Sequence, residues 1–257
     1  MQTFPDISND RHKRRSPIDT THSHHVLVTG ADKGLGLALV ARFLRGGFQV
    51  HAGIYASTDG LQVLLLDHGS CLNLVPLDVT DMASIQKAVV QVAGISPALD
   101  ILINNAAVYL PQKPVRVLAE LDFSDGHLEQ TLNVNTFGPL RVTQQFLPML
   151  EKGTRKLIIN ISSEAGSIGD CRRTSEYAYC MAKAALNMQS RIMQNDLEPG
   201  GFQVLVIHPG WMRTDMGGPE ADIAPEEAAD GIYELSMKPR QQEDPMYMDY
   251  QGKPIPW

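Results

Sequence analysis

A tyrosine and a lysine four residues apart, Tyr179 and Lys183, are the pair in this sequence whose types and spacing best suit acid–base chemistry. Residues 177–188 around them are predicted to form a helix, and side chains at positions i and i+4 share one face of a helix. A nearby cation favours the phenolate and lowers the pKa of a phenol from its usual value of about 10. Such a phenol can exchange a proton with a carbonyl or alcohol oxygen near neutral pH. Because Tyr-x-x-x-Lys also arises by chance, the rest of the chain must decide whether this pair is a site.

A glycine-rich turn at residues 30–36 is the second motif that could do chemistry. It lies between a predicted strand at residues 24–29 and a predicted helix at residues 37–44. In that position small residues let the backbone approach a phosphate, and the helix N-terminus supplies N–H groups and a positive dipole end. The spacing is Gly-x-x-x-Gly-x-Gly and not the commoner Gly-x-Gly-x-x-Gly. On spacing alone, a nucleotide site and a plain strand–helix turn both remain open.

Strands and helices alternate along the chain that positions these motifs. Apolar runs predict strands at residues 24–29, 48–54, 72–77, 100–103, 155–161, 203–207 and 246–249, and helices at residues 82–92, 127–150, 177–197 and 225–237. This alternation predicts an α/β fold, a single Rossmann-type domain with a doubly wound parallel sheet and helices on both faces. Polar residues follow the carboxyl ends of the strands, where open α/β sheets bind ligands.

Composition narrows the class of protein. The 257 residues suit one folded domain, expected at 24–257, and the first 23 residues are polar and are expected to be a disordered tail. The net charge of -7 argues against nucleic acid as a partner. Three cysteines without metal-ligand spacing predict no metal site and a reducing compartment, hence a cytoplasmic location. A membrane span needs about 20 apolar residues, and no run approaches that length.

Several short motifs occur in one order along the chain, and with them the sequence resembles the classical short-chain dehydrogenase/reductase family from about His25 to the C-terminus. The motifs are Thr29-Gly30-x-x-x-Gly34-x-Gly36, Asp78-Val79, Asn104-Asn105-Ala106, Asn135, Ser163, Tyr179-x-x-x-Lys183 and Pro209-Gly210. Segments 161–169, 183–188 and 208–218 are similar to the sniffer-like and C-factor-like branch of carbonyl reductases.

The resemblance implies catalytic roles for four residues. Tyr179 would be the general acid/base, and Ser163 would orient the substrate carbonyl. Lys183 would hold the nicotinamide ribose and lower the Tyr179 pKa. Asn135 would kink its helix and anchor a water in a proton relay. Ser167 precedes the tyrosine by 12 residues and Ser163 by 16, and the family spacing of about 13 favours Ser167, but Ser163 directly continues the strand and is the serine we predict.

The resemblance also implies a nicotinamide cofactor. Its expected contacts are Gly30, Lys33, Gly34, Leu35, Gly36, Asp78, Val79, Asn105, Ala106, Tyr179, Lys183, Pro209, Gly210 and Thr214. NADP(H) is preferred, because the second strand ends without an acid and Lys33 could meet a 2′-phosphate. One departure from the family weakens this choice, because Tyr55 stands where the branch often has Arg. Lys33 could equally be a solvated lysine, so NAD(H) stays open. Ala107 replaces the usual glycine and adds a Cβ close to the cofactor.

The sequence therefore predicts an NADP(H)-dependent oxidoreductase that reduces the carbonyl of a ketone, aldehyde or quinone to an alcohol, or catalyses the reverse. Its partner would be a small-molecule carbonyl or alcohol, and a homodimer and a homotetramer are both open. The alternative is a nucleotide-binding signalling or regulatory protein of low turnover, since a fold does not fix function. The intact set of Ser163, Tyr179 and Lys183 favours the enzyme.

Overall fold

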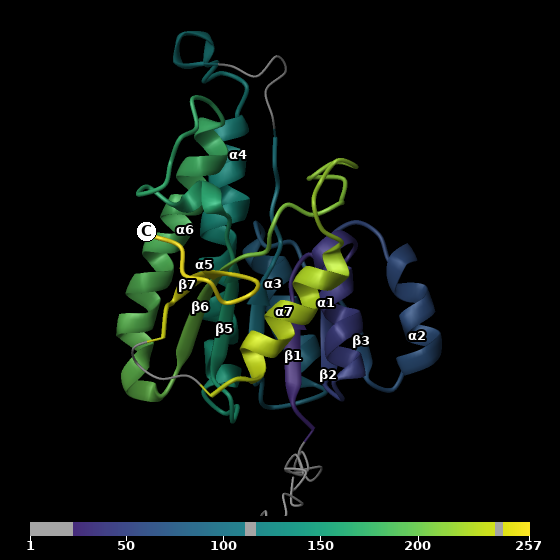
Figure 1. Cartoon of the computed structure of the whole chain (residues 1–257). Coiled ribbons are helices and arrows are strands. Elements are labelled where there is room, and N and C mark those ends of the chain that lie inside the picture. The colour runs from purple at the N-terminus through teal and green to yellow at the C-terminus, as the bar shows by residue number, and fades with distance from the viewer. Residues whose placement is uncertain (1–22, 111–116, 240–243) are drawn as a thin grey trace, which may run out of the picture.

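The computed structural model describes residues 23–110, 117–239 and 244–257 (Figure 1). Within them seven parallel strands form one sheet in the order β3-β2-β1-β4-β5-β6-β7. The strands are β1 (His25–Val28), β2 (Gln49–Ile54), β3 (Leu72–Pro76), β4 (Ile101–Asn104), β5 (Leu157–Ile161), β6 (Gln203–His208) and β7 (Tyr247–Asp249). The chain thus runs outward from β1 to β3, returns to β4 beside β1, and continues to β7. The predicted Rossmann-type fold is confirmed.

Helices cover both faces of this sheet. They are α1 (Gly34–Arg45), α2 (Gln62–His68), α3 (Met82–Ala93), α4 (His127–Leu132), α5 (Gly138–Leu150), α6 (Tyr177–Leu197) and α7 (Pro225–Met237). Buried residues of α1 and α7 pack on one face, and those of α3, α5 and α6 pack on the other. Figure 1 shows α7 crossing the near side of the sheet beside α1. Neighbouring strand residues serve opposite faces, as the pleat requires, so Val26 and Val28 join the first core and Leu27 joins the second.

The long helix predicted at 127–150 is interrupted. A π-helical turn, η3 (Asn133–Phe137), separates α4 from α5 and contains both mid-helix asparagines. A π turn widens the helix by one residue and often marks a functional position. The helix type thus changes at Asn135, and the kink expected there stays a prediction.

An aspartate begins helix α3. The Asp81 carboxylate caps α3 by accepting the N–H groups of Ala83 and Ser84 at 3.0 and 3.2 Å. No helix among the described residues is both long and apolar enough to cross a membrane. The predicted polar tail falls almost wholly in residues 1–22, which lie outside the described part of the chain.

Candidate active site

Three serines follow β5, and two of them are tied to the framework. Ser162 donates its hydroxyl to Asn187 Oδ1 at 2.6 Å. Ser167 donates to the main-chain oxygen of Pro256, also at 2.6 Å. Both hydroxyls therefore anchor the loop after β5 to the protein framework. Ser163 lies between them in sequence but contacts neither Asn187 nor Pro256 through its hydroxyl.

Ser163 lies beside Tyr179. Its side chain caps the short turn η4 (Glu164–Gly166) by accepting the Ala165 N–H at 3.2 Å, which holds it at the end of β5. The side chain is also near enough to the Tyr179 phenol to lower the pKa of that phenol. The structure thus brings together the serine and the tyrosine that the sequence singled out.

Lys183 lies one turn along α6 from Tyr179, with a side chain that is only 2% exposed. Its ammonium lies 5.7 Å from the centroid of the Tyr179 ring and donates a 2.9 Å hydrogen bond to the main-chain oxygen of Ile161. The predicted i, i+4 arrangement on one helix face is present. The carbonyl at the end of β5 is the direct partner of the ammonium.

The electrostatics of this pair differ from the sequence expectation. Packing around the hydroxyl raises the pKa of Tyr179 to about 12, helped by the charge of Glu164 and opposed by Ser163. Burial lowers the pKa of Lys183 to about 8. We expected Lys183 to lower the Tyr179 pKa. Its ammonium instead donates to the Ile161 carbonyl, and desolvation of the phenol is the largest effect on the Tyr179 pKa. In this structure Tyr179 keeps its proton at neutral pH.

Asn135 is buried in the π turn and pairs with Val108. Its Oδ1 accepts the Val108 N–H, and its Nδ2 donates to the Val108 carbonyl, both at 2.8 Å. The side chain therefore fastens the segment after β4 to η3. The proposed role of Asn135 in anchoring a water stays a prediction, because both ends of its amide already bind this backbone.

The glycine turn before α1 has the shape of a phosphate cradle. Gly30 and Gly34 have φ angles of +61° and +54°, which favour glycine. A Cβ on Gly36 would lie 2.0 Å from the Gly30 oxygen, so the turn closes only around glycine. The first turn of α1 contains no acid, so its N–H groups and positive dipole end suit an anion. These features fit the pyrophosphate of a dinucleotide.

Residues after β4 support this cradle. Asn105 donates from Nδ2 to the carbonyls of Thr29 and Gly30 at 2.9 and 3.0 Å. The Thr29 hydroxyl in turn accepts the N–H groups of Asn105 and Ala106, each at 3.0 Å. Asn104 lies deeper and bridges to Thr143 and Asn160. The Asn-Asn-Ala motif thus joins the glycine turn to the centre of the sheet.

Two charged residues inside the glycine turn have partners that the sequence did not indicate. Lys33 donates to Asp215 at 2.6 Å, and both side chains are largely exposed. The Asp32 carboxylate accepts N–H groups from three successive residues after β2, Tyr55 to Ser57, at 2.9 to 3.1 Å. The loop after β2, which has no acid of its own at the strand end, is therefore held by the Asp32 carboxylate from the glycine turn.

The remaining predicted cofactor contacts lie along the same carboxyl edge of the sheet. Asp78 follows β3 and accepts the N–H and hydroxyl of Thr80. Gly210 follows β6 with a φ of +84°, and Thr214 lies against Gly34. Leu35 is 5% exposed and points into the core, so only its backbone could meet a ligand. Val79 and Pro209 complete this edge as buried residues.

A charged network beside Ser163 and Tyr179 was missed from the sequence. Arg173 forms ion pairs with Glu164 and Glu176, and Glu176 accepts the hydroxyl of Tyr109. The Tyr109 ring contacts Tyr179 edge-on, with centroids 5.3 Å apart. The only sequence signal was the acid directly after the serine. The loop that carries Arg173 gave no indication of where it folds.

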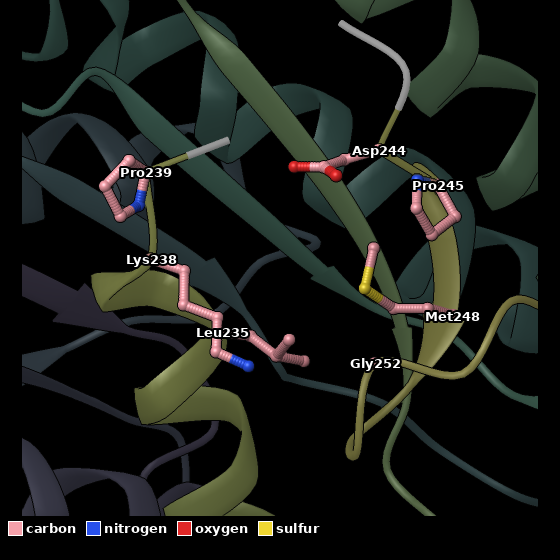
Figure 2. A pocket seen from close by; sticks show the side chains of 7 residues that line it. All are labelled: Leu235, Lys238, Pro239, Asp244, Pro245, Met248 and Gly252. Carbon is pink, nitrogen blue, oxygen red and sulfur yellow. The ribbon is translucent and has the colours of Figure 1, made fainter. Parts of the chain in front are cut away.

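A cavity of about 330 Å³ lies between the end of α7 and the start of β7, at the opposite edge of the sheet (Figure 2). Figure 2 shows its lining residues Leu235, Lys238, Pro239, Asp244, Pro245, Met248 and Gly252. None of the predicted site residues lines it. Among the residues that the structure describes, no group of three His, Cys, Asp or Glu side chains could hold a metal ion.

Comparisons of sequence and structure relate this chain to known proteins. A sequence profile of the family described as short chain dehydrogenase matches residues 24–223. The chain is 38% identical over 159 residues to the C-signal protein of Myxococcus xanthus, covering 62% of this chain and 93% of that protein. The carbonyl reductase Sniffer of D. melanogaster superposes with a TM-score of 0.84 at 28% identity, over 92% of this chain and all of that one. An NADPH-bound carbonyl reductase from chicken fatty liver gives 0.81 at 31% identity, over 91% and 99%.

Proposed function

The chain belongs to the short-chain dehydrogenase/reductase family, and from this premise we propose that it is an NADP(H)-dependent carbonyl reductase. It would reduce the carbonyl of a ketone, aldehyde or quinone to an alcohol, or catalyse the reverse. The observation that carries the proposal is the meeting of Ser163, Tyr179 and Lys183 at the end of β5. This trio shares the carboxyl edge of the sheet with the glycine cradle.

The side chains would divide the chemistry as follows. The cofactor, when bound, supplies the hydride, while the protein supplies orientation and the proton. Tyr179 would donate its proton to the carbonyl oxygen, and Ser163 would hold that oxygen in place. A phenol pKa of about 12 keeps Tyr179 protonated at neutral pH, which favours the direction of reduction. Lys183 would hold the nicotinamide ribose, and Asn135 would support the proton path.

The cofactor would lie along the carboxyl edge. Gly30, Gly34 and Gly36 would admit the pyrophosphate to the N-terminus of α1. Lys33 is the basic residue that could reach a 2′-phosphate, although Asp215 holds it in this structure. The similarity to an NADPH-bound reductase supports NADP(H) as the preferred cofactor, with NAD(H) as the alternative. The assembly state and the cellular location stay predictions.

A panel of ketones, aldehydes and quinones with NADPH and NADH, followed by nicotinamide absorbance, tests the proposal. Tyr179→Phe should lower turnover by ~10² to 10⁴-fold while cofactor binding persists. Tyr177→Phe is the matched control, because Met181 and not a lysine stands four residues after it. A wild-type chain that binds NADPH but turns over none of these carbonyls would favour the low-turnover binding protein instead.

A further inference from the structure

The residue directly after the proposed catalytic serine carries a carboxylate that faces it. Glu164 Oε2 accepts the Ser163 hydroxyl at 2.6 Å. Its other oxygen, Oε1, accepts the guanidinium of Arg173, which holds the carboxylate in this orientation. Ser163 is 7% exposed, whereas the Glu164 side chain is 50% exposed. Glu164 therefore links a buried hydroxyl to solvent.

Ser163 stands between Tyr179 and the same carboxylate. Its hydroxyl donates to Glu164, and its side chain is near enough to the Tyr179 phenol to lower the pKa of that phenol. A serine hydroxyl can donate one proton and accept another, so it can pass a proton between two neighbours. Tyr179, Ser163 and Glu164 thus follow one another from the buried phenol to the half-exposed carboxylate.

We infer that Glu164 is a positioning residue that orients the Ser163 hydroxyl and returns protons from solvent to the Tyr179–Ser163 pair. This inference rests on the proposed function, since it concerns the proton consumed in carbonyl reduction. It assigns to the loop after β5 a proton path separate from the water relay expected at Asn135. The Asn135 amide is already bound at both ends by Val108, which makes a second path useful.

The proton transfers balance along this row. Tyr179 gives its phenolic proton to the carbonyl oxygen, so one O–H bond breaks and one forms on the product. Water or buffer protonates the Glu164 carboxylate. The phenolate then takes the Ser163 proton, and Ser163 Oγ takes the proton from the Glu164 carboxyl. Tyr179 and Ser163 are left protonated and Glu164 ionised, as they began. The net cost is one proton from solvent for each alcohol formed.

Other charged groups around Glu164 set its state. Arg173 and the Ser163 bond lower the Glu164 pKa, against the burial that would raise it. His208 Nδ1 lies 3.5 Å from Oε2 on the far side, and burial lowers its pKa, so it is neutral near pH 7. Beyond these lie Glu176, paired with Arg173, and Asp249, which acts on His208. Glu164 is thus ionised at neutral pH, and we expect proton return to slow as the pH rises.

The test compares Glu164→Gln with Glu176→Gln in the full-length chain. Both variants break one ion pair to Arg173, but only Glu164 contacts Ser163. With NADPH and a carbonyl from the panel, we expect Glu164→Gln to lower kcat about 10²-fold, flatten its fall with pH and enlarge the solvent isotope effect. The KM for NADPH should be unchanged. Glu176→Gln should change kcat by less than about fivefold. Glu164→Asp should recover part of the lost turnover.

Three outcomes would overturn the inference. Equal losses in Glu164→Gln and Glu176→Gln, with normal pH profiles, would show that only the Arg173 ion pairs matter. A faster Glu164→Gln enzyme would show that the carboxylate restrains Ser163 and does not serve it. If the wild type turns over and Tyr179→Phe does not, either of these two results would rule out the role of Glu164 and leave the proposed function standing. A wild-type chain without turnover overturns the proposed function, and this inference with it.

Discussion

The hydroxyl of Tyr247 donates a 2.5 Å hydrogen bond to the main-chain oxygen of Ser163. Tyr247 belongs to the last strand and is 1% exposed, so the bond lies inside the protein. The same end of the chain holds the loop after Ser163, because the Gly169 N–H donates to the Trp257 oxygen at 2.8 Å. The C-terminal residues therefore fix the position of the proposed catalytic serine.

Tyr247→Phe should lower kcat several-fold and cost about 1 kcal/mol of unfolding free energy, the usual worth of one hydrogen bond. Ser163 would keep its side chain but lose a backbone anchor. Tyr250→Phe is the control, because its hydroxyl bonds to Glu227 at an exposed position away from Ser163. Steady-state kinetics and urea unfolding of both variants decide the point. Equal kinetics in the two would mean that the anchor does not act on the site.

Ser163→Ala should cost ~10² to 10³-fold in kcat, as loss of an aligned donor to a developing oxyanion does. Ser167→Ala should lose stability instead, because its hydroxyl holds Pro256. Ser162→Ala should behave likewise through its bond to Asn187. Turnover and thermal unfolding of the three variants separate these effects. An inactive Ser167→Ala beside an active Ser163→Ala would place the catalytic serine in the loop.

Lys33→Ala should raise the KM for NADPH about tenfold and leave that for NADH nearly unchanged, if Lys33 pairs with the 2′-phosphate. Because Asp215 holds Lys33 at 2.6 Å, Asp215→Asn supplies a test of opposite sign. Freeing the ammonium should lower the KM for NADPH. Parallel changes for both cofactors would remove Lys33 from the choice between them.

The sheet order and the edge that bears the site could be predicted, because apolar strands and glycine turns are local patterns. The motifs at Gly30, Asn105 and Ser163 each follow a strand, and parallel strands place their carboxyl ends together. The Asp81 helix cap was predictable for the same reason, since a cap acts within four residues.

Features that depend on contacts distant in sequence could not be predicted. The rise of the Tyr179 pKa to about 12 comes from packing around its hydroxyl, which no spacing reveals. The pairing of Lys33 with Asp215 spans the chain from α1 to the loop after β6. The network of Glu164 and Arg173 depends on how a polar loop folds back, and nothing in its composition fixes that path.

Lys183→Met should stabilise the fold near neutral pH while it abolishes turnover. Burial lowers the Lys183 pKa from 10.5 to about 8, which corresponds to roughly 3 kcal/mol of destabilisation while the folded lysine is charged. Between these two pKa values the unfolded chain binds a proton that the folded chain lacks, so wild-type stability rises with pH across that window. The lost bond to the Ile161 oxygen offsets about 1 kcal/mol. We therefore expect Lys183→Met to gain about 2 kcal/mol near pH 7 and to lose this advantage by about pH 10.

Lys156→Met removes a lysine that donates to a carbonyl at an exposed position, and its stability difference should not follow this pH course. Urea unfolding of the three proteins across that range measures the differences, and a destabilised Lys183→Met with no dependence on pH would mean that the buried ammonium is well compensated in the fold.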